Sequence, residues 1–251
     1  MDVQRKKRSN VQKSLRRRWK NLKGSLIKML LLAGFLLIML VGIYLGISTR
    51  RPIVYRLHLQ DVAVTVDGED LTLADMAYYV VYEEMNVEKD ARIYDSKRPK
   101  KYWNTHANGV FVAPEARRIA MEMAIHDRIL LRKAQEEGIV LSTEEKEQLE
   151  RRRTDFWEDL FDEQKENLPV SYSRIDKTIG QLALVQKYQM KLAEENGRTY
   201  ASYNWDGAFY EQLRKEHDVS IHKLVWNRVQ VGDVSLKHEA DFTPARKWGG
   251  G

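Results

Sequence analysis

The chain has 251 residues, a formal net charge of +6 and no cysteine. Its length is sufficient for one or two domains with a buried core. The absence of cysteine excludes a disulfide framework, a thiolate metal site and a cysteine nucleophile.

The positive charge is concentrated at the start of the chain. Eleven of the 42 Lys and Arg residues, but only one of the 36 Asp and Glu residues, lie in residues 1–49, so this block carries +10. The other 202 residues hold 31 basic and 35 acidic side chains and carry −4. The basic pI is therefore no indication of nucleic-acid binding by the folded part, and we expect no nucleic-acid partner.

An uncharged stretch, "MLLLAGFLLIMLVGIYLGI", follows the basic block at Met29–Ile47. About 20 apolar residues span a bilayer core of ~30 Å, so this stretch predicts a transmembrane signal-anchor helix over residues 29–49. The positive-inside rule then places the basic tail, residues 1–28, in the cytoplasm and the C-terminal domain outside it, in a single-pass protein of the cell membrane. A cleaved signal peptide is the alternative, although its apolar region is normally ~7–15 residues.

After a linker at residues 50–60, the pattern predicts a strand and then helices. Alternating Val62, Val64 and Val66 indicate a strand that ends at the turn pair Asp67-Gly68. Thr72 followed by Asp75 is typical of a helix start. This helix is expected to run to about residue 88 and to be followed by a long connection over residues 89–112.

The remaining chain predicts further helices and one late strand. A helix led by Pro114 is expected to end at Gly138, and the capping box Ser142-x-x-Glu145 opens another that ends near residue 167. Helices over 174–196 and 208–216 and a strand over 219–231 follow. Residues 231–251 are expected to be a poorly ordered tail. The predicted fold is mainly α, with the two distant strands pairing into a small two-stranded β element.

Three segments carry a family resemblance: "VAVTVDGEDLTLADM", "DRILLRKAQEEGIVLSTEE" and "FYEQLRKEHDVSIHKLV". In this order they resemble the N-terminal domain of SurA/PrsA-type chaperones (foldases), over about residues 61–228. The resemblance implies a helical chaperone domain at residues 61–230. In that family, a strand opens an isomerase domain of the parvulin type. The segment "SIHKLVW", which contains His222, partly matches that strand.

We expect no enzyme activity. Only 29 residues follow His222, too few for a parvulin domain, so a prolyl isomerase is not expected. The six histidines never occur at the i, i+4 spacing of a helical metal site, and no catalytic serine motif or phosphate-binding glycine loop occurs. Adjacent acids such as Glu83-Glu84 are interpreted as solvated helix faces. No metal and no cofactor are predicted.

Aromatic side chains are the predicted binding residues. Tyr and Trp suit surfaces that accept varied apolar segments, although most large side chains of a helical domain belong to its core. We predict that a subset lines a groove for unfolded chains: Tyr79, Tyr82, Tyr102, Trp103, Phe156 and Trp157.

Three classes of function are compatible with these features. The first is a membrane-anchored extracytoplasmic chaperone or holdase that binds unfolded or exported polypeptides. The second is a dedicated interaction or regulatory module of a cell-envelope or secretion complex with a chaperone-like fold. The third, a structural protein built on helices that continue from the membrane, is disfavoured by Pro52 and the strand at 62–66. The sequence favours the first and leaves the oligomeric state open.

Overall fold

The computed structural model describes residues 29, 32, 34–43, 46, 51–107 and 109–238. The chain divides into two compact units, Met1–Arg51 and Pro52–Gly251. The described residues that form the hydrophobic core all lie in the second unit, between Tyr55 and Leu236. That unit therefore has its own core, which is the property expected of a part that folds by itself.

The first unit corrects one sequence prediction. Among the residues that the structure describes, no helix is both long enough and apolar enough to cross a membrane. The predicted transmembrane helix over residues 29–49 is therefore wrong for the described chain. The predicted basic tail, residues 1–28, lies outside the described residues.

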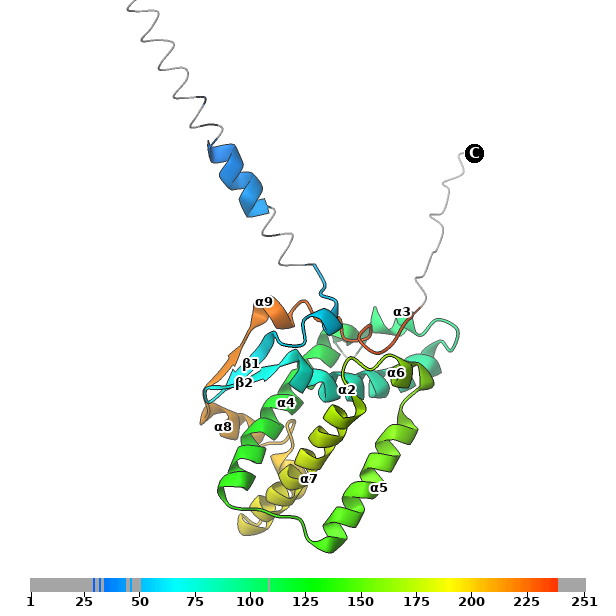
Figure 1. Ribbon diagram of the computed structural model, residues 1–251, viewed down its shortest axis with the longest axis vertical. Coiled ribbons are helices and arrows are strands. Elements are labelled where there is room, and N and C mark those ends of the chain that lie inside the picture. The colour runs from blue at the N-terminus through cyan, green and yellow to red at the C-terminus, as the bar shows by residue number, and fades with distance from the viewer. Residues whose placement is uncertain are drawn as a thin grey trace, which may run out of the picture. The chain divides into compact units, whose positions relative to one another are not determined.

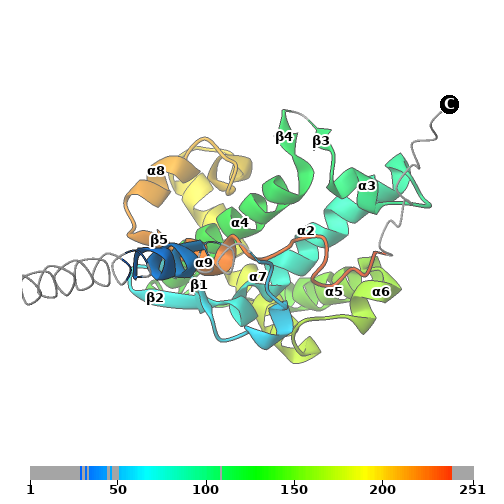
Figure 2. The ribbon, with the colours of Figure 1, turned by 90° about the horizontal axis from the view of Figure 1, so that it is seen from above.

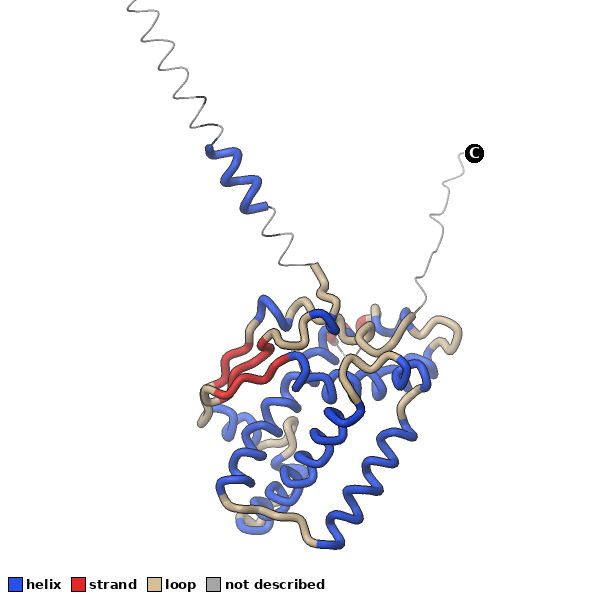
Figure 3. The backbone as a smooth tube through the Cα atoms, in the orientation of Figure 1, coloured by secondary structure: helices blue, strands red, loops and turns tan. Residues whose placement is uncertain are grey.

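The second unit is mainly helical, with the three strands of its main sheet on one side (Figures 1 and 3). Its elements, in chain order, are η1 (Tyr55–Leu57), β1 (Val62–Val66), β2 (Glu69–Thr72), α2 (Leu73–Tyr94), α3 (Lys100–Trp103), β3 (His106–Ala107), β4 (Val110–Phe111), α4 (Val112–Glu136), α5 (Thr143–Asp159), α6 (Asp162–Glu166), α7 (Tyr172–Glu195), η2 (Tyr200–Tyr203), α8 (Tyr210–Lys215), β5 (Val219–Ile221) and α9 (Lys223–Trp226).

The main sheet pairs the two ends of the unit. β1 lies between β2 and β5 and is antiparallel to both, with Val64 opposite Ile221 and Val66 opposite Val219. The predicted pairing of the first and last strands is thus present, but the strand predicted over 219–231 is only β5, because the chain turns into α9 at Lys223. The predicted two-stranded element is corrected to a three-stranded sheet, because β2 forms a hairpin with β1. Asp67, with φ of 50°, and Gly68, with φ of 80°, form its tight turn.

The helix ends follow local signals. At α2 the Asp75 carboxylate accepts from the Thr72 N–H at 2.9 Å, and at α5 the Ser142 Oγ accepts from the Glu145 N–H at 3.2 Å. The predicted helix start at Thr72 and the predicted capping box at Ser142 are both present, and each forms a capping box. Gly138, with φ of 66°, follows α4 in the left-handed conformation that a glycine adopts without a steric cost.

Two element boundaries differ from the prediction because buried side chains decide them. α2 continues to Tyr94, since Ala91 is fully buried and Arg92 pairs with Glu88 one turn earlier at 2.9 Å. The helix expected to end near residue 167 stops at Asp159. There Leu160 adopts an extended conformation, with φ of −66° and ψ of 137°, and is buried in the core.

The core is formed where α2, α4 and α7 pack side by side (Figures 1 and 2). α5 packs against α7 at the edge of this group and buries only two of its side chains, Leu149 and Phe156. The largest fully buried apolar side chains are Leu73, Met76, Trp103, Met121, Ile125, Ile129, Leu130, Ile175 and Leu236.

The segments expected to be a linker and a disordered tail belong in part to this core. In the predicted linker, residues 50–60, Tyr55 is buried and its hydroxyl donates to the Leu73 carbonyl at 2.5 Å. In the predicted tail, Val231, Ser235 and Leu236 are buried. We call residues 229–238 the C-terminal strap. The strap corrects the predicted tail, of which residues 239–251 lie outside the described residues.

Candidate functional site

The six predicted binding residues do not line one groove. Tyr79 and Trp103 are buried, with 6% and 1% of their surface exposed. The Trp103 indole donates to the Glu88 carboxylate at 3.0 Å. Its ring also lies against Gly232, where φ is 102° and an added Cβ would come within 2.6 Å of the ring. Trp103 therefore supports the strap and is not available to a client polypeptide.

Three of the predicted residues join one aromatic cluster between α2, α5 and the start of α7. The Tyr78 ring stacks on Tyr82 at 5.9 Å and lies 5.3 Å from Phe156. Trp157 contacts Phe156 at 5.1 Å and Tyr172 at 4.6 Å. The Trp157 indole also donates to Asp176 at 2.9 Å. This cluster fixes the sparsely packed α5 to its neighbours, which is a structural role.

Tyr102 is half-buried and lies beside exposed apolar side chains. Its ring is 5.5 Å from that of Tyr94 at the end of α2. The β3–β4 hairpin follows α3 within three residues and exposes Val110 and Phe111. Figure 2 shows α3, β3 and β4 together at one corner of the unit. We call this surface the α3 corner; it comprises Ile93, Tyr94, Tyr102, Val110 and Phe111.

Four apolar side chains of the α3 corner are exposed, and Tyr102 is half-buried. Ile93 is 85% exposed, Tyr94 61% and Phe111 59%. Single exposed apolar side chains are common, but several on consecutive elements mark an interaction surface. Sequence reasoning found Tyr102 but did not select its neighbours, because the exposed side of a helix end depends on how that helix packs.

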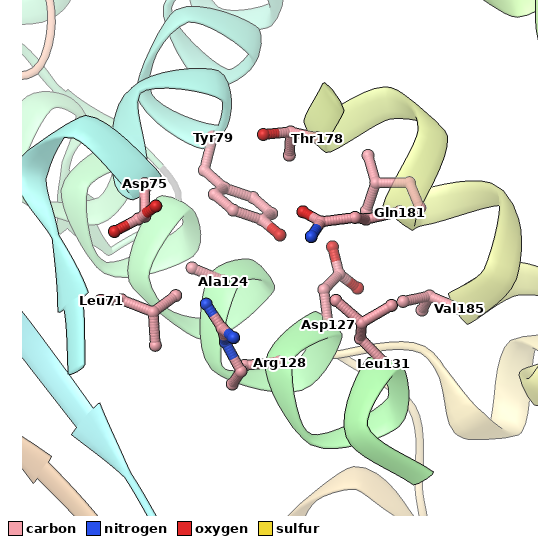
Figure 4. Close-up of a pocket in the computed structure, with 11 residues that line it drawn as sticks. Leu71, Asp75, Tyr79, Ala124, Asp127, Arg128, Leu131, Thr178, Gln181 and Val185 are labelled. Atoms are coloured by element: carbon pink, nitrogen blue, oxygen red, sulfur yellow. The ribbon is translucent and has the colours of Figure 1, made fainter. Parts of the chain in front are cut away.

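A small cleft lies between α2, α4 and α7 (Figure 4). The Tyr79 hydroxyl points toward Asp127 and Gln181, and Asp75 and Arg128 stand at the other side of the cleft (Figure 4). Its volume is ≈ 40 Å³, which is sufficient for a few water molecules but not for a polypeptide segment.

The charges of this cleft are largely satisfied by protein groups. Asp75 pairs with Arg174 at 2.8 Å, and Arg128 pairs with Glu69 at 3.2 Å. Burial and the neighbouring Asp127 carboxylate raise the pKa of the Tyr79 hydroxyl well above its usual value. The tyrosine is therefore a neutral hydrogen-bonding group here, and the cleft fits a hydrated polar seam between helices.

Sequence reasoning also missed a buried acidic site on α2. Glu84 is fully buried, and its carboxylate accepts the backbone N–H groups of Gly232 at 2.6 Å, Val234 at 2.8 Å and Ser235 at 2.8 Å, together with the Ser235 hydroxyl. Glu83 is buried as well. The interpretation of Glu83-Glu84 as a solvated pair is thus wrong.

Glu88, one turn after Glu84, binds the end of the strap. It is fully buried and accepts from Arg92 at 2.9 Å, from the Trp103 indole at 3.0 Å and from His238 at 3.0 Å. Gln164 of α6 donates to the Ser235 hydroxyl at 3.0 Å from the other side of the strap. The acidic side chains of α2 therefore act as the attachment points of the C-terminal strap.

No group of three His, Asp or Glu side chains suited to a metal ion occurs in the described part of the chain. No family model, curated protein or solved structure matches this chain. The resemblance to SurA/PrsA-type chaperones accordingly stays a prediction from the sequence.

Proposed function

We propose that this protein binds apolar segments of unfolded or exported polypeptides and slows their aggregation. The observation that carries the proposal is the α3 corner, in which Ile93, Tyr94 and Phe111 are more than half exposed. Tyrosine and phenylalanine rings provide large contact areas to apolar segments of varied sequence. The predicted resemblance to a chaperone domain supports the same function.

The test measures how well the purified chain suppresses aggregation of two unrelated unfolded proteins. We expect suppression of both by the unmodified chain. A variant with Tyr94→Ser, Tyr102→Ser and Phe111→Ser loses three apolar contacts, so client affinity falls at least ~10-fold. A prolyl-isomerisation assay runs in parallel, and we expect no activity.

The matched control replaces three exposed apolar residues elsewhere: Val140→Ser, Met190→Ser and Tyr200→Ser. These side chains are 74%, 54% and 38% exposed. The control variant should suppress aggregation as well as the unmodified chain does. A well-folded chain that suppresses neither client would contradict the holdase function, and equal losses in both triple variants would contradict the role of the α3 corner.

The location of the folded unit is a second part of the proposal. A basic block followed by an uncharged apolar stretch is the order found in export signals, so we infer that Pro52–Gly251 acts outside the cytoplasm. Protease added to intact cells should then degrade this unit while a cytoplasmic marker survives. Protection of the unit until the cells are lysed would contradict this location.

A further inference from the structure

A second exposed surface combines aliphatic side chains with positive charge. Val54, beside η1, is 63% exposed, Leu57 in η1 is 79% exposed and Leu224 in α9 is 70% exposed. Arg56, Lys223 and Lys237 are exposed near them. We call these six residues the η1–α9 face.

The residues of the η1–α9 face come from both ends of the unit, which are joined beside it. The Ile53 N–H donates to the Arg228 carbonyl at 3.1 Å, which ties the segment before η1 to the segment after α9. Val54, Arg56 and Lys237 line the same surface hollow of ≈ 370 Å³. Figures 1 and 2 show η1, α9 and the C-terminal strap at the same end of the unit.

The cations of this face are not neutralised by the protein. Arg56, Lys223 and Lys237 make no side-chain ion pair within the part of the chain that the structure describes. The nearby acids are already engaged. Asp61 pairs with His58 at 2.9 Å, and Asp233 pairs with Lys100 and lies 3.6 Å from His238. Glu163 accepts from the Lys237 N–H and lies 3.8 Å from Arg92. The face therefore has a net positive charge.

We propose that the η1–α9 face docks on a membrane surface rich in anionic phospholipid. Aliphatic side chains that project beside lysine and arginine suit the headgroup boundary, where apolar groups enter the acyl region and cations meet phosphates. Each Lys or Arg near such a surface contributes about 1 kcal/mol. An acidic protein partner would match the positive charge. It would not provide an apolar environment for the exposed side chains of Val54, Leu57 and Leu224. This inference goes beyond the proposed function and does not depend on it.

The test uses the full chain and its lack of native cysteine. Leu57→Cys and Leu224→Cys place an environment-sensitive fluorophore on the face. Val140→Cys places it in the loop between α4 and α5, at the opposite end of the unit (Figure 1). With vesicles that contain phosphatidylglycerol, we expect a blue shift at Leu57 and Leu224 but not at Val140. Vesicles of phosphatidylcholine alone should cause no shift.

Charge neutralisation tests the electrostatic part. Arg56→Gln with Lys223→Gln should weaken the docking equilibrium about 30-fold, as reported by the Leu224 probe. Lys133→Gln with Lys146→Gln removes the same charge near the far end of α4 and the start of α5. This control pair should leave docking unchanged.

Several results would overturn the inference. If the protein binds vesicles while the probes at Leu57 and Leu224 stay exposed to solvent, another part of the chain binds the membrane. An equal shift at all three positions shows non-specific adsorption. A shift on adding soluble polyglutamate, but not on adding vesicles, shows that the face binds an acidic protein.

Discussion

Glu84→Gln is expected to lower the free energy of unfolding by about 3 kcal/mol. The Glu84 carboxylate accepts from three backbone N–H groups and the Ser235 hydroxyl, all on the strap. An amide has one oxygen in place of two, so its NH₂ group would face at least one buried N–H donor. Urea unfolding of the two proteins measures the difference.

Glu83→Gln is the matched control because the same change falls on the neighbouring buried residue. Burial raises the pKa of Glu83 to about 7, so above that pH the side chain is ionised and its buried charge lowers the stability of the fold. Removing that charge should leave stability unchanged or raise it at pH values of about 8. If both variants lost the same stability, the strap contacts would not be the cause, and limited proteolysis of residues 229–238 should then show no difference between them.

Local signals made much of this fold predictable. The capping box Ser142–Glu145 and the glycine stop at Gly138 lie within a few residues of the structure that they define. Alternating valines predicted β1, whose partner β5 follows from the need to pair a lone strand. β2 was missed because "EDLT" has little strand propensity and is paired by the hairpin turn.

The strap could not be predicted because its signal is tertiary. Glu84 and Ser235 are separated by 151 residues, and neither has a neighbouring residue that indicates the contact. Charged residues are rarely buried unless they are paired, so a sequence alone assigns Glu83 and Glu84 to solvent.

The burial of the aromatic residues could not be predicted for a related reason. Tyr79 and Tyr82 differ by less than one helical turn, yet only Tyr79 is buried, since it faces α4 and α7.

The stability of the protein is expected to fall by about 3 kcal/mol as the pH rises from 6.5 to about 9, because His238 loses its proton. Burial alone would lower the pKa of His238, but the nearby carboxylate of Asp233, at 3.6 Å, and the hydrogen bond to Glu88 outweigh burial and raise it to about 9. A pKa that is higher in the folded state stabilises the fold fully below the unfolded value of 6.5. That contribution disappears as the pH passes the folded value.

The measurement compares the unmodified chain with His238→Gln by urea unfolding from about pH 6 to about pH 9.5. Both carry Glu83→Gln, so that the titration of Glu83 at about 7 does not contribute. The His238→Gln protein should be less stable at low pH and nearly independent of pH over this range, since glutamine keeps a donor for Glu88 but has no charge to lose. Parallel pH profiles in the two proteins would show that His238 is not held as a cation against Glu88. The strap would then be held by its contacts with Glu84, Gln164 and Trp103, and its last residues would contribute little to the fold.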